Sequence, residues 1–315
     1  MTPVPPIRPA PRPVSRSSPS VQVLLSTYNG AEYLQPLLRS LDEQTHPRVE
    51  LLVRDDGSAD GTLELLRAHS GRVRPELRAG SHLGLPATYF ELVRESRPDG
   101  DLFAFCDQDD VWLPGKLARA AEMLAGTDPA APAMYCGRTQ YVDAELRPLG
   151  LSELPARPLT FQHALMQNVA TGCTMVMNRA ARDLLAESTP EDVFMHDAWA
   201  YLVIAAFGTV IYDPVPMVLY RQHASNTIGR PRGWRDRVAR FVRRGWNWPH
   251  LRQAAHFERQ YGARLQGEDR RALDRLLQSR TSFPRRVRYA LSLDSHRRGL
   301  RDDLAFRILY IAGRM

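Results

Sequence analysis

The sequence VQVLLSTYNG, at residues 21–30, decides the fold because an apolar run stops abruptly at a polar turn. The run from Val21 to Leu25 predicts a buried strand, and the residues from Thr27 to Gly30 predict the turn that ends it. Residues 31–44 follow with apolar side chains at helical spacing, which predicts a helix. A strand, a turn and a helix are therefore expected in that order.

The same order repeats in VELLVRDDGSADGT, at residues 49–62. Residues 49–53 predict a second strand, and residues 62–69 predict a helix that Ser58 or Asp60 can cap. Strands that alternate with helices indicate an α/β fold with a parallel sheet. The other expected elements are helices at 85–94, 113–124, 161–166 and 180–187, a strand at 102–106, strands between 133 and 149, and a turn or strand at 171–177.

Three carboxylates, Asp107, Asp109 and Asp110, crowd the turn after the strand at residues 102–106. Ligands of open α/β sheets bind at the carboxyl ends of strands, which is where this turn lies. Repulsion among the three would cost stability unless a cation compensates it, and carboxylate oxygens suit Mg²⁺ or Mn²⁺, which in turn binds a diphosphate. The alternative is an acidic turn that only caps the next helix. The aromatic Trp112 beside it favours a pocket wall.

The turn at residues 55–62 is a second candidate site. Its glycines permit a tight approach to a flat ligand such as a nucleobase, although a plain turn with a helix cap explains the same residues. It is not a dinucleotide fingerprint, because no G-x-G-x-x-G follows either early strand.

Two histidine-containing segments, His196-Asp197 and His223, supply further polar candidates. A carboxylate can take a proton as a general base, and Asp197 is the candidate for that role. Isolated histidines are more often structural than functional, so that reading stays open for both. The segment NVATGC at residues 168–173 either lines a ligand cleft or is a loop leading into a buried strand.

Composition limits the class of protein. With 315 residues and 43% hydrophobic side chains, the chain can bury a full core, yet its apolar runs fall far short of the roughly 20 residues that span a bilayer. Three isolated cysteines, Cys106, Cys136 and Cys173, predict neither a zinc site nor disulfides and favour a reducing cytoplasm. Residues 1–19, rich in Pro, Arg and Ser, predict a disordered leader without a secretory signal.

The net charge of +7 is unevenly placed, because arginines crowd residues 230–314. Such asymmetry predicts an anionic partner, and without a nucleic-acid-binding signature we expect a membrane surface and no nucleic acid. The tail, residues 230–315, predicts basic amphipathic helices in which Trp234, Trp246 and Trp248 suit an interfacial helix. Solvated faces or salt bridges are the alternative reading of these arginines.

Six motifs then occur in an order that resembles the inverting family 2 glycosyltransferases of the GT-A fold, and among them the rhamnosyltransferase-like branch. They are LLSTYNG (24–30), RDDGSADGT (54–62), FCDQDDVWLP (105–114), TGCT (171–174), MHDAW (195–199) and YRQHASN (220–226). The resemblance spans residues 21–229. It implies a Rossmann-like, mostly parallel sheet flanked by helices, formed by a domain at 20–229 with the basic helical region as an extension.

The resemblance also implies roles for individual residues. Asp197 would be the catalytic base, although the family often has Glu-Asp where this chain has His196-Asp197. Asp107, Asp109 and His223 would hold Mg²⁺ or Mn²⁺. The donor nucleotide would contact Thr27, Tyr28, Asn29, Asp55, Asp56, Asp107 and Gln108. The sugar pocket would include Asp110, Trp112, Thr171, Gly172, His196 and Trp199.

The forms DQDDVW and HDAW are most similar to transferases that use dTDP-L-rhamnose, acting on a glycan or lipid-linked acceptor in cell-surface polysaccharide synthesis. We expect such an enzyme in the cytoplasm, with peripheral contact at the inner face of the membrane. A UDP-sugar-dependent hexosyltransferase and an inactive nucleotide-sugar-binding module are the alternatives. A nucleotidyltransferase would need a Gly-rich, basic phosphate loop where STYNG stands.

Overall fold

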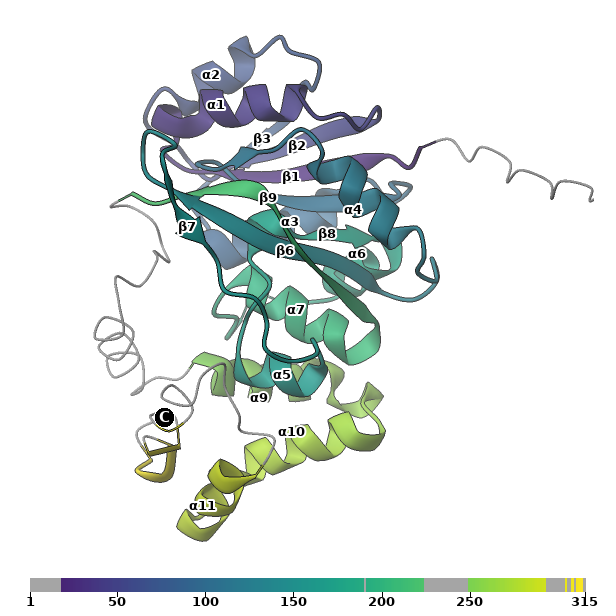
Figure 1. Ribbon diagram of the computed structural model, residues 1–315, viewed down its shortest axis with the longest axis vertical. Coiled ribbons are helices and arrows are strands. Elements are labelled where there is room, and N and C mark those ends of the chain that lie inside the picture. Colours follow the sequence, from purple (N-terminus) through teal and green to yellow (C-terminus); the bar gives the residue numbers. More distant parts are fainter. Residues whose placement is uncertain are drawn as a thin grey trace, which may run out of the picture.

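A computed structural model describes residues 18–189, 191–223 and 249–292, with part of residues 304–313. One sheet forms its centre, and helices cover both faces (Figure 1). The strands are β1 (Val21–Thr27), β2 (Val49–Asp55), β3 (Pro75–Ala79), β4 (Leu102–Asp107), β5 (Val111–Trp112), β6 (Ala133–Val142), β7 (Pro148–Leu151), β8 (Val176–Asn178) and β9 (Thr209–Arg221). The helices are α1 (Ala31–Asp42), α2 (Thr62–Ala68), α3 (Leu85–Glu95), α4 (Lys116–Leu124), α5 (Phe161–Met166), α6 (Arg179–Ala186), α7 (His196–Phe207), α9 (Pro249–Tyr261), α10 (Gly267–Ser279) and α11 (Phe283–Leu291), with a short 3₁₀ helix η1 (Gly172–Thr174).

The first half of the sheet is parallel, in the order β3-β2-β1-β4. Residues 21–27 of β1 are buried along their whole length, as expected for a strand covered on both faces. The strand and helix alternation predicted from residues 21–69 is confirmed here. The carboxyl ends of these parallel strands meet at one edge of the sheet.

The second half of the sheet is mixed, in the order β8-β6-β9-β5. Strand β8 runs antiparallel to both β4 and β6, whereas β9 runs parallel to β6. Strand β7 follows β6 after a short turn and pairs with it antiparallel. The short connection from β6 to β7 requires an antiparallel pair, so the second half combines antiparallel pairs with the parallel β6–β9 pair.

Side chains of β1 alternate between two apolar layers. Val21, Val23 and Leu25 pack with α1, α2 and α4 on one face of the sheet. Leu24 packs in the other layer, with side chains of α3, α6 and α7. The fold is therefore a three-layer α/β/α arrangement with β1 near its middle.

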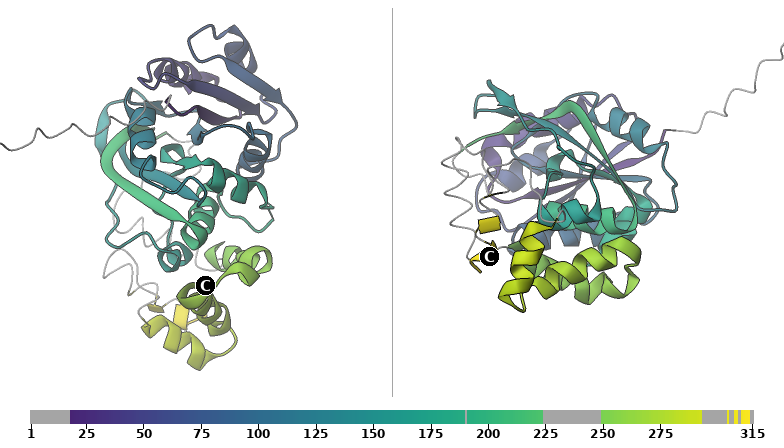
Figure 2. Two further views of the ribbon diagram at one scale, coloured as in Figure 1. Left: turned by 90° about the vertical axis from the view of Figure 1, so that its right-hand side faces the viewer. Right: turned by 60° about the horizontal axis from the view of Figure 1, so that its bottom comes forward.

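The C-terminal helices α9, α10 and α11 lie beyond α5 and α7, at the end of the molecule away from α1 and α2 (Figures 1 and 2). Leu251, Phe257 and Tyr261 of α9 belong to the same buried cluster as Trp199 of α7. These helices therefore share an apolar core with one face of the sheet.

Several sequence predictions fall on residues that the structure does not describe. They are the leader apart from residues 18 and 19, and Trp234, Trp246 and Trp248. In the described ranges, every helix is too short or too polar to traverse a lipid bilayer.

Candidate active site

The polar motifs meet at one edge of the sheet. Thr27, Asp55 and Asp107 are the last residues of β1, β2 and β4, and these three strands are neighbours. In register, Thr27 pairs with Asp55, and Ser26 pairs with Asp107. The expected ligand-binding edge is therefore assembled from motifs that lie up to 80 residues apart in the chain.

Asp55 is fully buried and is satisfied by its own loop. Its Oδ2 accepts hydrogen bonds from Thr27 Oγ1 (2.8 Å) and Ser58 Oγ (2.6 Å), and its Oδ1 accepts one from Ser58 N (2.8 Å). Asn29 joins the same network, because its N–H donates to Ser58 Oγ and its Oδ1 accepts from Ala59 N. Thr27, Asn29 and Asp55, predicted to bind nucleotide, thus hold the loop in shape.

Asp56 is also buried and has four donors around it. The guanidinium of Arg54 pairs with it, His82 Nδ1 lies 2.9 Å from its Oδ2, and the N–H groups of Leu83 and Gly84 donate to it. Burial alone would raise the pKa of this carboxyl, but these hydrogen bonds outweigh that effect and hold it below its usual range. We call residues 54–58 with 81–84 the nucleoside loop, after the role predicted for Asp55 and Asp56 from the sequence.

Two aromatic rings cover the outside of the nucleoside loop. Tyr28 is 44% exposed, and its ring centroid lies 4.4 Å from that of His82, whose side chain is 57% exposed. Flat exposed rings suit stacking on a nucleobase. Sequence reasoning found Tyr28 and missed His82, because only the pairing of β2 with β3 brings residue 82 to this edge.

Gln108 connects this region to the turn that follows β4. Its Oε1 accepts from Tyr28 N (2.9 Å), and its Nε2 donates to Tyr28 O (3.0 Å). Gly30 makes room for it, since a Cβ there would lie 2.1 Å from Gln108 Oε1. Gln108 was predicted to contact the nucleotide, but its amide is already engaged in holding the Tyr28 backbone.

We call residues 107–110 the acidic turn. Two of its carboxyl groups have a raised pKa, in contrast to Asp56. Burial raises the pKa of Asp107 above its usual range, and the charge of Asp109 adds to this. Asp107 Oδ1 accepts a hydrogen bond from Tyr89 OH (2.6 Å), and Asp109 Oδ2 lies 2.7 Å from His223 Nε2. The structure thus brings Asp109 and His223 together across 114 positions of sequence.

Asp110 is fully buried. Its Oδ1 accepts from Arg221 N (3.0 Å), while Oδ2 has no hydrogen-bond partner in the described part of the chain. Burial and the neighbouring Asp109 and Asp107 raise its pKa well above the usual range. The acidic turn does not cap α4, because that helix begins at Lys116 after Gly115 and has no side-chain cap. This removes the alternative of a simple capping turn.

Trp112 does not form a pocket wall. It is 1% exposed and packs in the apolar layer against α1 and α4. Lys116 is completely buried with its Nζ 3.0 Å from the centroid of that ring, and burial lowers the pKa of Lys116 to about 7. The sequence-based assignment of Trp112 to the sugar pocket is therefore wrong, and Lys116 is a buried cation that sequence reasoning did not anticipate.

Asp197 lies in the first turn of α7 and faces η1. Its Oδ2 accepts from Gly172 N (3.3 Å) and its Oδ1 from Ala198 N (2.6 Å). Burial raises the pKa of this carboxyl to about 6, against the opposing effect of these hydrogen bonds. The negative charge of Asp197 in turn raises the pKa of Asp107, so the two groups interact. Thr171 precedes η1, and its carbonyl oxygen accepts a hydrogen bond from the hydroxyl of Thr174.

The ring of His196 is buried beside Asp197. It stacks on Tyr89 with centroids 3.6 Å apart, and burial lowers its pKa to about 3, which keeps it neutral. A Cβ on Gly172 would lie 2.7 Å from His196 Nε2, so any larger residue there would have to displace the stacked His196 ring. His196 and Asp110 are therefore enclosed groups and do not present an open pocket surface.

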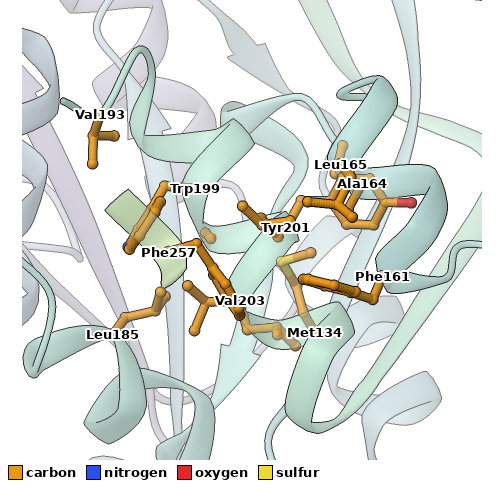
Figure 3. Packing of buried hydrophobic residues seen from close by; sticks show 14 of the residues in the cluster. Met134, Phe161, Ala164, Leu165, Leu185, Val193, Trp199, Tyr201, Val203 and Phe257 are labelled. Carbon is orange, nitrogen blue, oxygen red and sulfur yellow. The ribbon is translucent and has the colours of Figure 1, made fainter. Parts of the chain in front are cut away.

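Trp199 points away from the site. It is completely buried, its Nε1 donates to Ser188 Oγ (2.8 Å), and its ring packs near Phe257 of α9 (Figure 3). A helix turns about 100° per residue, so positions 197 and 199 face nearly opposite directions. The assignment of Trp199 to the sugar pocket is wrong for this reason.

The acidic turn fits a hard divalent cation. One oxygen of Asp107, one of Asp110 and the sulfur of Cys173 lie within 4.8 Å of one another. Carboxylate oxygens are preferred ligands of Mg²⁺ and Mn²⁺, and Asp110 Oδ2, which has no hydrogen-bond partner among the described residues, leaves a lone pair for such an ion. This group shares only Asp107 with the ligands predicted from the sequence, since Asp109 and His223 are paired with each other.

Residues 22–185 match the family described as Glycosyl transferase family 2. The chain belongs to this family. Among relatives of this family 2 glycosyltransferase, the dTDP-rhamnosyl transferase RfbG of Shigella flexneri is 24% identical over 245 residues, 70% of this chain and 80% of the relative. An uncharacterised glycosyltransferase of Nostoc sp. is 31% identical over 112 residues, and the chain spans only 34% of that relative's length.

The fold of the family 2 enzyme agrees with a solved structure. The mannosyltransferase PcManGT of Pyrobaculum calidifontis, in complex with GDP-Man and Mn²⁺, superposes with a TM-score of 0.54 at 21% identity, covering 98% of this chain and 78% of that chain. The GT-A fold predicted from the motifs is confirmed.

Proposed function

We propose that this glycosyltransferase moves L-rhamnose from dTDP-L-rhamnose to a hydroxyl of a glycan or lipid-linked acceptor in cell-surface polysaccharide synthesis. The observation that carries the proposal is the shared sheet edge. Asp107 at this edge interacts with Asp197 of α7, a buried carboxylate with a pKa of about 6, and its neighbour Gln108 bonds to the backbone of Tyr28, one of two exposed aromatic rings. The similarity to RfbG supports rhamnose as the donor sugar.

The donor nucleoside binds over Tyr28 and His82 in this proposal. Their rings offer flat apolar surface, and Asp55 and Asp56 of the nucleoside loop are already bonded to side chains of the same loop. A loop that is rigid before binding loses little conformational entropy when the nucleotide arrives.

Asp197 acts as the general base. It accepts the proton of the acceptor hydroxyl while that oxygen attacks the anomeric carbon in line, and the bond from this carbon to the diphosphate breaks with its electron pair leaving on the diphosphate. Configuration at the anomeric carbon inverts in one step. The N–H of Gly172 holds the carboxylate in place during the transfer.

Asp107 and Asp109, with His223 or Asp110 as further ligands, hold Mg²⁺ or Mn²⁺ in this proposal. The bound ion supplies positive charge that stabilises the diphosphate leaving group. Three carboxyl groups and one imidazole lie close together here, and two of the carboxyl groups have a raised pKa. This arrangement supports a cation as their partner.

We also propose that residues 20–229 form the catalytic unit and that the basic region at 230–315 contacts anionic lipid from the cytoplasmic side. The surface of α11 supports this, because Phe283 (57% exposed) and Leu291 (66% exposed) accompany the exposed Arg285 and Arg288. Co-sedimentation with vesicles of anionic lipid, compared with vesicles of neutral lipid, tests the contact. Absence of co-sedimentation with either kind of vesicle would refute it.

The test of donor choice is calorimetric titration of the purified protein with dTDP, UDP and GDP, each with Mn²⁺ or with chelator. The proposal expects binding that needs Mn²⁺ and favours dTDP. A preference for UDP would reassign the enzyme to UDP-sugars. Binding to none of the three would point to an inactive module, which an assay of sugar transfer would then decide.

A further inference from the structure

Tyr89 of α3 reaches the acidic turn from below the sheet edge. It is 1% exposed, and its hydroxyl lies 2.6 Å from Asp107 Oδ1 and 2.7 Å from the carbonyl oxygen of Cys106. Burial and the charge of Asp107 raise the pKa of this phenol well above its usual range, so the hydroxyl stays protonated. Its single hydrogen is best used on the carboxylate, because bonds to charged acceptors are the stronger ones.

The ring of Tyr89 is itself fixed from the other side. His196 stacks on it with centroids 3.6 Å apart and planes 19° from parallel, and Gly172 closes the space behind His196. His196 is the first residue of α7 and precedes Asp197. A continuous line of contacts therefore runs from the helix that carries the proposed base, through two stacked rings, to one oxygen of Asp107.

We propose that Tyr89 is a positioning residue for the acidic turn. Its hydroxyl fixes Asp107 Oδ1, which leaves the other oxygen oriented for the divalent cation and the donor diphosphate. The stack on His196 holds that hydroxyl at a constant position relative to Asp197. This inference rests on the proposed cation site, and it adds a residue that neither motif nor family membership assigns.

The variant Tyr89→Phe keeps the ring and its stack and removes only the hydroxyl. Partners that orient metal ligands typically change metal affinity by about 10- to 100-fold when they are removed. We expect a loss of that size in Mn²⁺ affinity, measured from the electron paramagnetic resonance signal of free Mn²⁺ in the presence of dTDP. The Mn²⁺ concentration for half-maximal transfer should rise by the same factor, while kcat at saturating Mn²⁺ recovers.

Tyr135→Phe is the matched control. Tyr135 is 1% exposed, and its hydroxyl also donates to a buried carboxylate, Asp213 Oδ2, at 2.9 Å. Each variant thus loses one tyrosine-to-carboxylate bond, but only one bond involves the acidic turn. We expect the control to change Mn²⁺ affinity less than twofold.

Three outcomes overturn the inference. Unchanged Mn²⁺ affinity in Tyr89→Phe would exclude positioning by the hydroxyl and leave the proposed cation site standing. Equal losses in Tyr89→Phe and Tyr135→Phe would assign a general structural role. A wild-type protein that binds dTDP but no Mn²⁺ would remove the cation site and the inference together, and thermal unfolding of both variants identifies loss of folding.

Discussion

The nucleoside loop and the acidic turn lie side by side and treat their carboxylates in opposite ways. Asp55 and Asp56 accept hydrogen bonds from the loop itself, and the pKa of Asp56 is held below its usual range. Asp107 is partly buried and Asp110 is fully buried, both have a raised pKa, and Asp110 Oδ2 has no partner in the described residues. Both regions follow parallel strands and both are acidic, so sequence composition does not separate them.

The difference indicates which carboxylates already have their hydrogen-bond donors without a ligand and which do not. The carboxylates of the nucleoside loop are already bonded within it, which suits the neutral base that we propose to bind there. The acidic turn and the nearby Asp197 retain charges that the fold penalises, which is typical of groups kept for binding or catalysis. Four experiments probe this contrast.

The largest effect is expected from Asp197→Asn. Removal of a general base typically lowers the rate by about 10²- to 10⁴-fold, so we expect transfer to fall by that factor while dTDP affinity stays within about threefold. Initial rates and calorimetry measure the two quantities. Asp183→Asn is the control, because that carboxylate lies on α6 with its side chain 56% exposed. A variant that keeps more than a tenth of wild-type activity would exclude Asp197 as the base.

Stability should separate the two acidic regions directly. Asp56→Asn leaves the nearly buried Arg54 without its partner, and broken buried ion pairs cost about 3 to 5 kcal/mol. Asp110→Asn removes a carboxyl whose ionised form the fold disfavours, so its free energy of unfolding should stay equal or increase. Urea unfolding at pH 7.5 in chelator measures both. Similar losses in the two variants would refute the contrast.

The pH dependence follows from Asp197. Its pKa rises from 3.8 unfolded to about 6 folded, so its stabilising contribution is complete below the unfolded pKa and is lost as pH rises through 6. Between pH 5 and pH 8, Asp197→Asn should therefore gain about 1 to 2 kcal/mol relative to wild type. Transfer by the wild type should rise with pH through about 6 because the base must be deprotonated. An unchanged difference between the two pH values would contradict this.

The smallest effect is expected where the two regions join. Gln108→Leu removes both hydrogen bonds to the Tyr28 backbone, which water can replace at this exposed position. We expect dTDP affinity to fall by about twofold to tenfold, corresponding to about 1 kcal/mol. Gln278→Leu, at an exposed position of α10, is the control. A loss above a hundredfold would mean that Gln108 contacts the nucleotide directly.

The sequence was informative where one local pattern decides one element. The strands and helices of residues 21–69 follow from apolar periodicity, and the acidic turn follows from its place after a strand. The mixed half of the sheet depends on how β6, β8 and β9 pair across long distances, which periodicity does not encode.

Within the site, proximity along the chain was misleading. Trp112 and Trp199 stand close to Asp110 and Asp197 in sequence, but strand alternation and helix rotation direct both rings into the core. Tyr89 and His82 were missed because each reaches the site only through tertiary packing, Tyr89 by stacking on His196 and His82 by its contact with Asp56. Apolar spacing on α3 makes Tyr89 indistinguishable from an ordinary core residue.

The anchoring of α9 limits how this enzyme can be recombined. The hydroxyl of Tyr261 donates a hydrogen bond to the carbonyl of Leu184 and lies within hydrogen-bond distance of Ser188 Oγ. Ser188 Oγ also accepts a hydrogen bond from the indole N–H of Trp199, two residues after the proposed base. A chimera that exchanges the C-terminal helices between family members must therefore carry complementary rings, or it will disturb the catalytic helix as well as the tail. Changing the acceptor preference by exchanging these helices would therefore require side chains that fit the apolar core shared by α7 and α9.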